Sequence, residues 1–204
     1  MKQLAILGAS GHGKVVAEIA EISGWDVVLF DDAYPTLNHL EHWPVVGTTD
    51  DLVAVLEDFD GCFVAIGNNK IRLDKQKELV AQGAVFPILI HPSGVVSRYA
   101  QVGIGSVVMA GAVINSFTRI GQACIVNTAS TIDHDCVLGD GVHISPGANL
   151  AGGIEIGETS WVGIGASVKE LITIGRDVTI GAGAVVILGI PDGKTAIGVP
   201  AKIL

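Results

Sequence analysis

Aromatic side chains are scarce in this 204-residue chain: Phe, Trp and Tyr make up only 5% of it, although 49% of its residues are hydrophobic. Its apolar character, with a mean hydropathy of +0.54, therefore comes mainly from Val, Ile, Leu and Ala. Long apolar runs are missing too, because Gly, Asp or Asn interrupts each of them well before the roughly 18 residues that a membrane span needs. This composition excludes a disordered chain, predicts no membrane segment and favours a fold of repeated small units.

Cysteine and positive charge are also in short supply. Three cysteines, an odd number without a CxxC spacing, argue against a disulfide framework and fit a reducing compartment. Because the N-terminus also lacks a long apolar signal segment, we expect a cytoplasmic protein. Only 12 Lys and Arg stand against 21 Asp and Glu, so the net charge of -9 disfavours nucleic acid and anionic membranes as partners. A phosphate-bearing ligand would need local backbone amides to hold it.

What the chain does contain is a repeat. Stepping by six residues from Val96 to Val186, sixteen positions in a row are aliphatic, with no insertion, and the position four residues after each is small or β-branched in nearly every case. Period six suits short strands joined by tight corners, three to a turn of a solenoid. Fifteen hexads then predict five coils of eighteen residues, with the aliphatic side chains inside. Cys124 and Cys136 fall on the small inward register, so we expect them in the core.

Residues 1–90 follow a different pattern, in which strands alternate with helices. Strands are expected over 2–7, 26–32, 61–67 and 84–90, and helices over 14–23 and 69–83. Such alternation predicts a small Rossmann-like parallel sheet. The boundary is placed at the His91-Pro92 pair, so that residues 91–204 form the solenoid with a C-terminal cap, where Pro191 and Pro200 are expected to end the last coil.

A glycine-rich segment, GASGHG at residues 8–13, lies between the first strand and the first helix. Its spacing is not that of the dinucleotide motif, but its amides and the helix N-terminus could hold a phosphate, and a tight turn is the alternative. Asp31 and Asp32 end the second strand and Gly67 ends the third, all at the carboxyl edge where ligands of parallel sheets bind, although a simple turn explains Gly67 equally well. These acids suit the ribose of NAD as well as a nucleotide sugar.

Within the repeat, the segment NTASTIDHDC places His134 between Asp133 and Asp135. His134 is the third residue of its hexad, so its imidazole should project from a corner of the prism, where Asp135 can raise its basicity and make it a general base. His143 is expected on another face. Gly152 lies one coil after His134, leaving an open floor where a backbone N–H could meet an oxyanion.

A second column of the repeat contains Ile164 and Ala182, which are one coil apart in the segments VGIGA and IGAGA. Their small, glycine-flanked surroundings predict a flat track along which an extended ligand could lie.

These motifs together resemble a known family. The hexads with NTASTIDHDC, GVHISPGA and GVPAK are similar to the hexapeptide-repeat acyltransferases. With GASGHG, LFDD and AIGNN ahead of them, the whole chain resembles the branch of UDP-4-amino-sugar N-acetyltransferases of the bacillosamine pathway and the sialic acid O-acetyltransferases. The resemblance implies a left-handed parallel β-helix that binds acetyl-CoA, an α/β domain that binds a nucleotide sugar, no metal, and a homotrimer with active sites between subunits.

The resemblance also implies roles for individual residues. His134 would be the catalytic base, with Asp135 at the position where the bacillosamine enzymes have Glu. The implied acetyl-CoA contacts are Asn127, His143, Gly152, Ile164 and Ala182, and the implied substrate contacts are Ser10, Gly11, His12, Asp31, Asp32 and Gly67. The expected reaction is direct acetyl transfer to the 4-amino group of a nucleotide-linked 4-amino-4,6-dideoxy sugar, most simply UDP-linked, for bacterial glycan biosynthesis.

Three alternatives stay open at the level of sequence. O-acetylation of sialic acid would use the same base. A non-catalytic protein with an NAD-binding domain and a structural solenoid would explain the glycine-rich segment but not the acidic residues around His134. A metal site between subunits, as in carbonic anhydrases of this fold, would need three histidines, and the repeat contains only His134 and His143.

Overall fold

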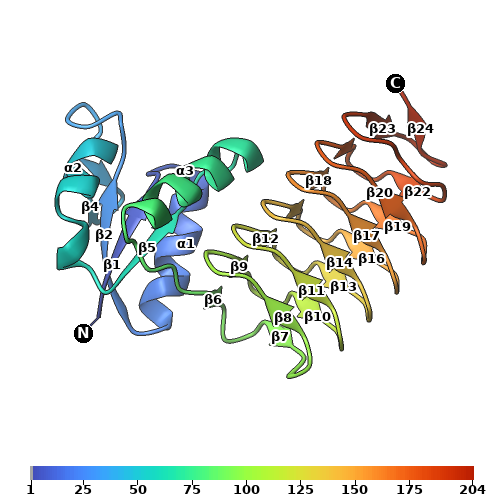
Figure 1. The fold of residues 1–204 in the computed structure, drawn as a ribbon, viewed down its shortest axis with the longest axis horizontal. Helices are drawn as coiled ribbons and strands as arrows, with labels where there is room; N and C mark the ends of the chain where they lie inside the picture. Colours follow the sequence, from blue (N-terminus) through green and yellow to red (C-terminus); the bar gives the residue numbers. More distant parts are fainter. Residues whose placement is uncertain (1) are drawn as a thin grey trace. The chain divides into compact units, whose positions relative to one another are not determined.

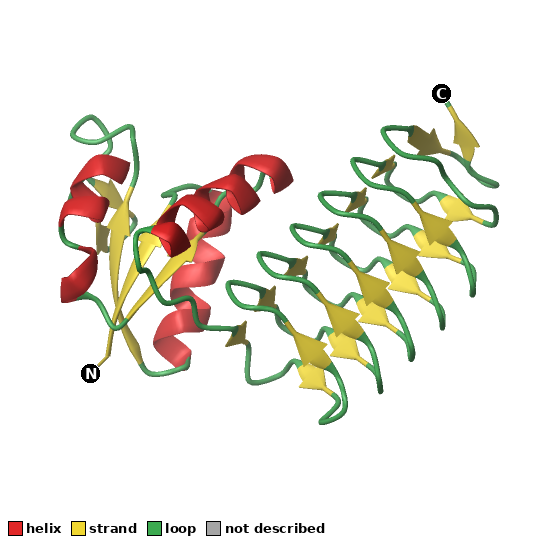
Figure 2. Cartoon of the chain, in the orientation of Figure 1, coloured by secondary structure: helices red, strands yellow, loops and turns green. Residues whose placement is uncertain are grey.

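The computed structural model describes residues 2–204, which form two compact units. The first unit ends at Ile90 and the second is His91–Leu204 (Figure 1). Helices occur only in the first unit, whereas the second is built from short strands and turns (Figure 2). Among the described residues, no helix combines the length and the apolarity that crossing a bilayer requires.

The first unit is built on a parallel sheet with the strand order β2-β1-β5. Its strands are β1 (Lys2–Leu7), β2 (Trp25–Phe30) and β5 (Gly61–Val64), and its main helices are α1 (Gly11–Ile22) and α3 (Asn69–Ala81). Buried apolar side chains from these elements form the core, as the alternating pattern predicts. Since the strands are parallel, their carboxyl ends meet at one edge, which carries the segments that follow Leu7, Phe30 and Val64.

The prediction of a fourth strand over 84–90 is wrong for most of its length. Only Leu89–Ile90 (β6) is a strand, and residues 84–88 form a loop in which the Val85 carbonyl accepts a hydrogen bond from the Cys62 N–H at 2.8 Å. Pro87 lies in this loop and has no N–H to donate to a strand ladder.

The sequence analysis also passed over the segment between β2 and β5. It contains β3 (His39–Leu40), β4 (Trp43–Pro44), α2 (Thr49–Ala54) and the 3-10 helix η1 (Leu56–Asp58). These short elements leave little periodic signal, because each is at most six residues long.

The second unit is a parallel β-solenoid. Its strands are β7 (Val95–Val96), β8 (Gln101–Val102), β9 (Val107–Val108), β10 (Val113–Ile114), β11 (Arg119–Ile120), β12 (Ile125–Val126), β13 (Thr131–Ile132), β14 (Val137–Leu138), β15 (His143–Ile144), β16 (Asn149–Leu150), β17 (Glu155–Ile156), β18 (Trp161–Val162), β19 (Ser167–Val168), β20 (Thr173–Ile174), β21 (Thr179–Ile180), β22 (Val185–Val186), β23 (Thr195–Ile197) and β24 (Lys202–Ile203). Each strand from β10 to β19 pairs in parallel with the strands eighteen residues before and after it. At the C-terminal end, β24 pairs antiparallel with β23.

The register of the repeat agrees with the prediction. The aliphatic positions from Val108 to Val186 are all in one buried core, and Cys124 and Cys136 are buried with them. Buried hydroxyl groups on the small register also bond to the backbone: the Thr118 hydroxyl donates to the Asp133 carbonyl at 2.7 Å and accepts from the Cys136 N–H at 3.2 Å. The core thus fixes the backbone on both sides of His134.

The corners share one backbone conformation. Every sixth residue from 105 to 183 has a positive φ, and these residues form three columns, one along each edge of the prism. Glycine occupies half of these positions, and the others are Phe117, Ala123, Ala129, Asp135, Thr159, Leu171 and Asp177. A residue with a Cβ is less stable than Gly in this left-handed conformation by about 1–2 kcal/mol.

Candidate active site

The His134 corner is built by the turn that follows β13. The side chain of His134 is 61% exposed, and its Nδ1 lies 2.7 Å from Asp135 Oδ2. The hydrogen bond that His134 Nδ1 donates to the Asp135 carboxylate, together with the negative charge of Asp133, raises the pKa of His134 above its usual value. With Nδ1 bonded to the carboxylate, Nε2 is the ring nitrogen that can exchange a proton with a ligand.

Asp133 supports this corner from the other side. Its Oδ1 accepts hydrogen bonds from the His134 N–H and from Asn115 Nδ2, both at 2.8 Å. These bonds lower the pKa of Asp133, so it stays ionised near neutral pH. The sequence analysis identified Asp133 only as a sequence neighbour of His134. It missed Asn115, which lies one coil before Asp133 and could have been found by the eighteen-residue step.

Gly152 lies against the imidazole ring. A Cβ at this position would be 2.7 Å from His134 Cε1 and 2.8 Å from Nε2, so only glycine leaves the ring where it is. The next residue, Gly153, donates its N–H to the His134 carbonyl at 2.9 Å. Within residues 2–204, the Gly152 N–H donates no hydrogen bond. The predicted open floor is therefore not free in this structure: Gly152 is buried, and the imidazole ring of His134 covers it.

A hollow of about 430 Å³ opens beside this corner. It is lined by Asp133, His134, Asp135, Ala151, Gly152, Gly153, Glu170 and Leu171. It therefore combines an imidazole, three carboxylates and one large apolar side chain, and it is open enough to admit a ligand group to His134.

The second predicted track lies along a different corner. A hollow of about 400 Å³ is lined by His143, Ser145, Pro146, Trp161, Gly163, Ile164, Thr179, Ile180, Gly181 and Ala182. The structure thus places His143 on the same track as Ile164 and Ala182. Ile164 is largely exposed, and Gly163 and Gly181 add no side chain to the hollow, so its lining is mostly apolar or small.

Asn127 belongs to this track through His143. Its Nδ2 lies 3.1 Å from His143 Nε2, while its Oδ1 accepts the Thr128 N–H at 2.8 Å, which fixes the orientation of the amide. The His143 ring is stacked on Trp161 with 5.7 Å between centroids and 6° between planes. The sequence analysis missed Trp161, although it lies eighteen residues after His143 and so had to share its column.

The glycine-rich segment opens α1 at the carboxyl edge of the first unit. Ser10 is the N-cap of α1, its side chain makes no capping hydrogen bond, and both Ser10 and Gly11 are exposed. Gly8 and Gly13 serve the turn instead, because a Cβ on Gly13 would be 2.4 Å from the Gly8 carbonyl oxygen. The segment can therefore be both a tight turn, which needs Gly8 and Gly13, and a ligand-binding site, which would use Ser10 and Gly11.

The acidic residues after β2 already make hydrogen bonds within the protein. Asp31 accepts the N–H of Ala9 at 2.7 Å and that of Ala33 at 2.9 Å, so its carboxylate ties the glycine-rich segment to the end of β2. Asp32 accepts the N–H of Thr49 at 2.8 Å, which lowers the pKa of Asp32. Asp31 thus lies at the predicted site, whereas Asp32 is directed toward the start of α2.

His12 and Gly67 are connected through a buried arginine. Arg72 is 1% exposed, and its Nη1 donates to the carbonyls of Ile66 and Gly67 at 3.0 and 3.1 Å. Burial, followed by the charge of Arg72, lowers the pKa of His12 to about 4, so His12 is neutral near pH 7. Its Nε2 is buried and has no hydrogen-bond partner among the described residues. A Cβ on Gly67 would meet only open space.

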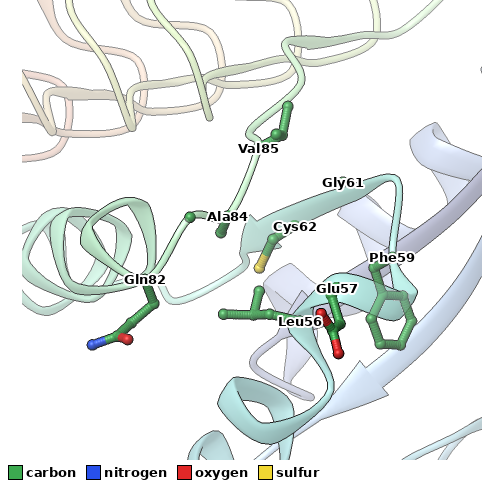
Figure 3. A pocket seen from close by; sticks show the side chains of 9 residues that line it. Leu56, Glu57, Phe59, Gly61, Cys62, Gln82, Ala84 and Val85 are labelled. Atoms are coloured by element: carbon green, nitrogen blue, oxygen red, sulfur yellow. The ribbon is translucent and has the colours of Figure 1, made fainter.

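A third hollow, of about 160 Å³, lies near the start of β5 and is lined by residues that include Leu56, Phe59, Cys62 and Val85 (Figure 3). Because β5 is parallel to β1, this is the amino edge of the sheet, opposite to the glycine-rich segment. Cys62 is no nucleophile there, since burial raises the pKa of its thiol to about 12. Within residues 2–204, no group of three or more His, Cys, Asp or Glu side chains is placed to hold a metal ion.

Comparison with known proteins relates this geometry to a family. Residues 3–79 match the family described as the PglD N-terminal domain. A curated UDP-N-acetylbacillosamine N-acetyltransferase of Bacillus subtilis (strain 168) is 40% identical over 115 residues, which are 54% of this chain and 52% of that protein. The match thus spans about half the length of that curated relative.

Solved structures also match the whole chain. The acetyltransferase domain of PglB from Neisseria gonorrhoeae, in complex with acetyl coenzyme A, is 46% identical with a TM-score of 0.95, covering 100% of this chain and 99% of that one. A variant of perosamine N-acetyltransferase from Caulobacter crescentus, in complex with CoA and GDP-perosamine, is 41% identical with a TM-score of 0.96, covering 100% and 97%. These matches confirm the predicted fold class, a Rossmann-like α/β domain followed by a left-handed parallel β-helix, and the chain belongs to the bacillosamine-type family of hexapeptide-repeat sugar N-acetyltransferases.

Proposed function

We propose that this protein transfers the acetyl group of acetyl-CoA to the 4-amino group of a nucleotide-linked 4-amino-4,6-dideoxy sugar, with UDP as the nucleotide. The observation that carries the proposal is the exposed His134, whose Nδ1 is bonded to Asp135 and whose ring lies over Gly152, in a chain of this family. The structural match with GDP-perosamine bound supports a nucleotide-sugar acceptor, and the bacillosamine relative supports UDP.

In the proposed reaction, His134 Nε2 removes a proton from the sugar amine as the amine nitrogen bonds to the thioester carbonyl carbon. The carbon–sulfur bond then breaks, and the departing CoA sulfur receives the proton from His134, so the products are the N-acetyl sugar and free CoA. Asp135 stabilises the imidazolium, and the Gly152 N–H is the donor proposed for the oxyanion. No covalent acyl-enzyme is required.

The acetyl-CoA site is proposed along the track of Ile164 and Ala182, with His143 and Asn127 at its start and Gly152 near the thioester. The track fits a pantetheine arm because its lining is mostly apolar and because Gly163 and Gly181 add no side chain to it. The nucleotide sugar is proposed to lie on Ser10, Gly11, His12, Asp31, Asp32 and Gly67.

A homotrimer is part of the proposal, because the two hollows of the solenoid lie on different corners. His134 follows a strand of the β13 sheet, whereas Ile164 follows a strand of the β18 sheet. A ligand on the second corner would meet the His134 corner of a neighbouring subunit if solenoids packed side by side.

The three buried free thiols support a reducing, cytoplasmic location.

The test is CoA release from acetyl-CoA by the purified protein with a panel of acceptors: UDP-, GDP- and dTDP-linked 4-amino-4,6-dideoxy sugars and sialic acid. Rapid release with a UDP-linked amino sugar, lost in His134→Ala, is the expected result. Release with sialic acid alone would replace the proposal with O-acetylation. No release with any acceptor would favour a non-catalytic, nucleotide-binding protein, which equilibrium binding of NAD and CoA would then examine.

A further inference from the structure

The three corner columns differ in their side chains although their backbone is the same. Two of them carry only Gly, Ala, Thr or Asp at the positive-φ positions from 105 to 183. The column that contains Asp135 also contains Phe117 and Leu171, with φ of 63° and 59°. Large apolar residues are unfavourable in this conformation, so their concentration on the His134 corner requires an explanation.

Phe117 has a partner within the chain. Its ring is stacked on Tyr99, with 5.4 Å between centroids and 18° between planes, and the Arg98 guanidinium lies 4.8 Å from the Tyr99 centroid. Phe117 does not line the hollow beside His134. The stacking interaction is therefore enough to account for its presence.

Leu171 is different, because it lines the same hollow as His134. It is 80% exposed, more than any other large apolar residue among those described. A Cβ on Gly153 would be 2.7 Å from Leu171 Cδ2, so the side chain of Leu171 leans over Gly153, next to the Gly152 floor under the imidazole. Leu171 therefore forms an apolar wall of a hollow whose other side chains include Asp133, Asp135 and Glu170.

We propose that Leu171 is a specificity-determining residue that receives the C6 methyl group of the acceptor sugar. This inference rests on the proposed function. When the 4-amine is at His134, the substituent of the neighbouring C5 atom lies close by, and the methyl group is the one apolar substituent of a 4-amino-4,6-dideoxy sugar. A hydroxymethyl group at the same place would lose its water against Leu171 without gaining a hydrogen bond. The polar hydroxyl groups of the sugar would face the carboxylates.

The experiment compares kcat/KM for UDP-4-amino-4,6-dideoxyglucose and for its 6-hydroxy analogue, UDP-4-amino-4-deoxyglucose, in the full-length protein. A hydrophobic pocket discriminates such pairs by about 10- to 100-fold. We expect Leu171→Gly to reduce this ratio about 10-fold or more, and Leu171→Asn to reduce it further. Both substitutions suit a positive φ, so neither should lower the thermal unfolding midpoint.

Asp177→Gly is the matched control, because Asp177 is exposed, has the same backbone conformation and lies one hexad later on another corner. It should leave the ratio unchanged. An unchanged ratio in active Leu171→Gly would overturn the inference while leaving the proposed function intact. Two other results would overturn the inference about Leu171. One is a Leu171→Gly variant that alters the choice between acetyl-CoA and propionyl-CoA instead, and the other is a changed oligomeric mass of this variant in light scattering. Wild-type protein inactive toward every amino sugar would remove the proposed function itself.

Discussion

The two regions proposed to bind ligands are built in opposite ways. In the first unit, the polar groups at the carboxyl edge are committed to the fold: Asp31 bonds two backbone amides, Asp32 bonds a third, and His12 is kept neutral by burial beside Arg72. On the solenoid, His134 and Asp135 project from a corner that the core already holds in place. A substitution should therefore affect folding and binding together in the first region, and chemistry alone in the second.

The largest effect is expected from His134→Ala. Loss of a general base lowers kcat by about 10²- to 10⁴-fold, while an exposed side chain can be removed with little change in the unfolding midpoint. Steady-state kinetics and thermal unfolding test both statements. A His143→Ala variant should instead raise KM for acetyl-CoA, and equal loss of kcat in the two variants would contradict the assignment of separate roles.

Gly152→Ala tests how much the position of the imidazole matters. The added methyl group would lie 2.7 Å from the ring, so the ring must move, and we expect kcat to fall about 10- to 100-fold. The crystal structure of the variant should show a displaced His134 with an unchanged backbone. A fully active variant would mean that the ring works equally well in another position.

Asp31→Ala tests the first region, where we expect effects on stability and on substrate binding instead of on kcat. Two backbone N–H groups lose their acceptor, which lowers the free energy of unfolding by about 1–3 kcal/mol and should raise KM for the nucleotide sugar. Urea unfolding and kinetics measure the two effects. The matched variant is Asp135→Ala, which should leave the unfolding free energy unchanged because that carboxylate is exposed.

The pH dependence of kcat and KM compares the two regions through the pKa values of His134 and His12. His134 must be neutral to accept a proton, so its raised pKa moves the acidic limb of kcat to higher pH than an ordinary histidine would give. Asp135→Asn removes the main cause of that shift and should move the limb to lower pH. His12, with a pKa of about 4, stays neutral between pH 5 and 8 and should therefore add no pH dependence to KM for the nucleotide sugar in that range. A KM that followed the kcat limb would contradict this separation.

The solenoid was easier to predict from sequence than the first unit. Its period places every residue by arithmetic, so His134, Gly152, Ile164 and Ala182 could be assigned to columns without a structure. The same eighteen-residue step also places Trp161 beside His143 and Asn115 beside Asp133. In the first unit, the position of Arg72 depends on how α3 packs, and helical periodicity alone does not predict a buried cation. The strand expected over 84–90 fails for a local reason, the proline at 87.

The unbroken eighteen-residue step also limits how such a chain can change in length. Removing six residues between Val96 and Val186 would turn every later side chain onto the next face of the prism and separate His134 from Gly152 if the cut fell between them. Removing eighteen would shorten the stack by one layer of about 4.8 Å and keep every later residue on its own face. Gain or loss of a whole coil therefore changes the length of the stack and keeps the arrangement of side chains on each remaining face.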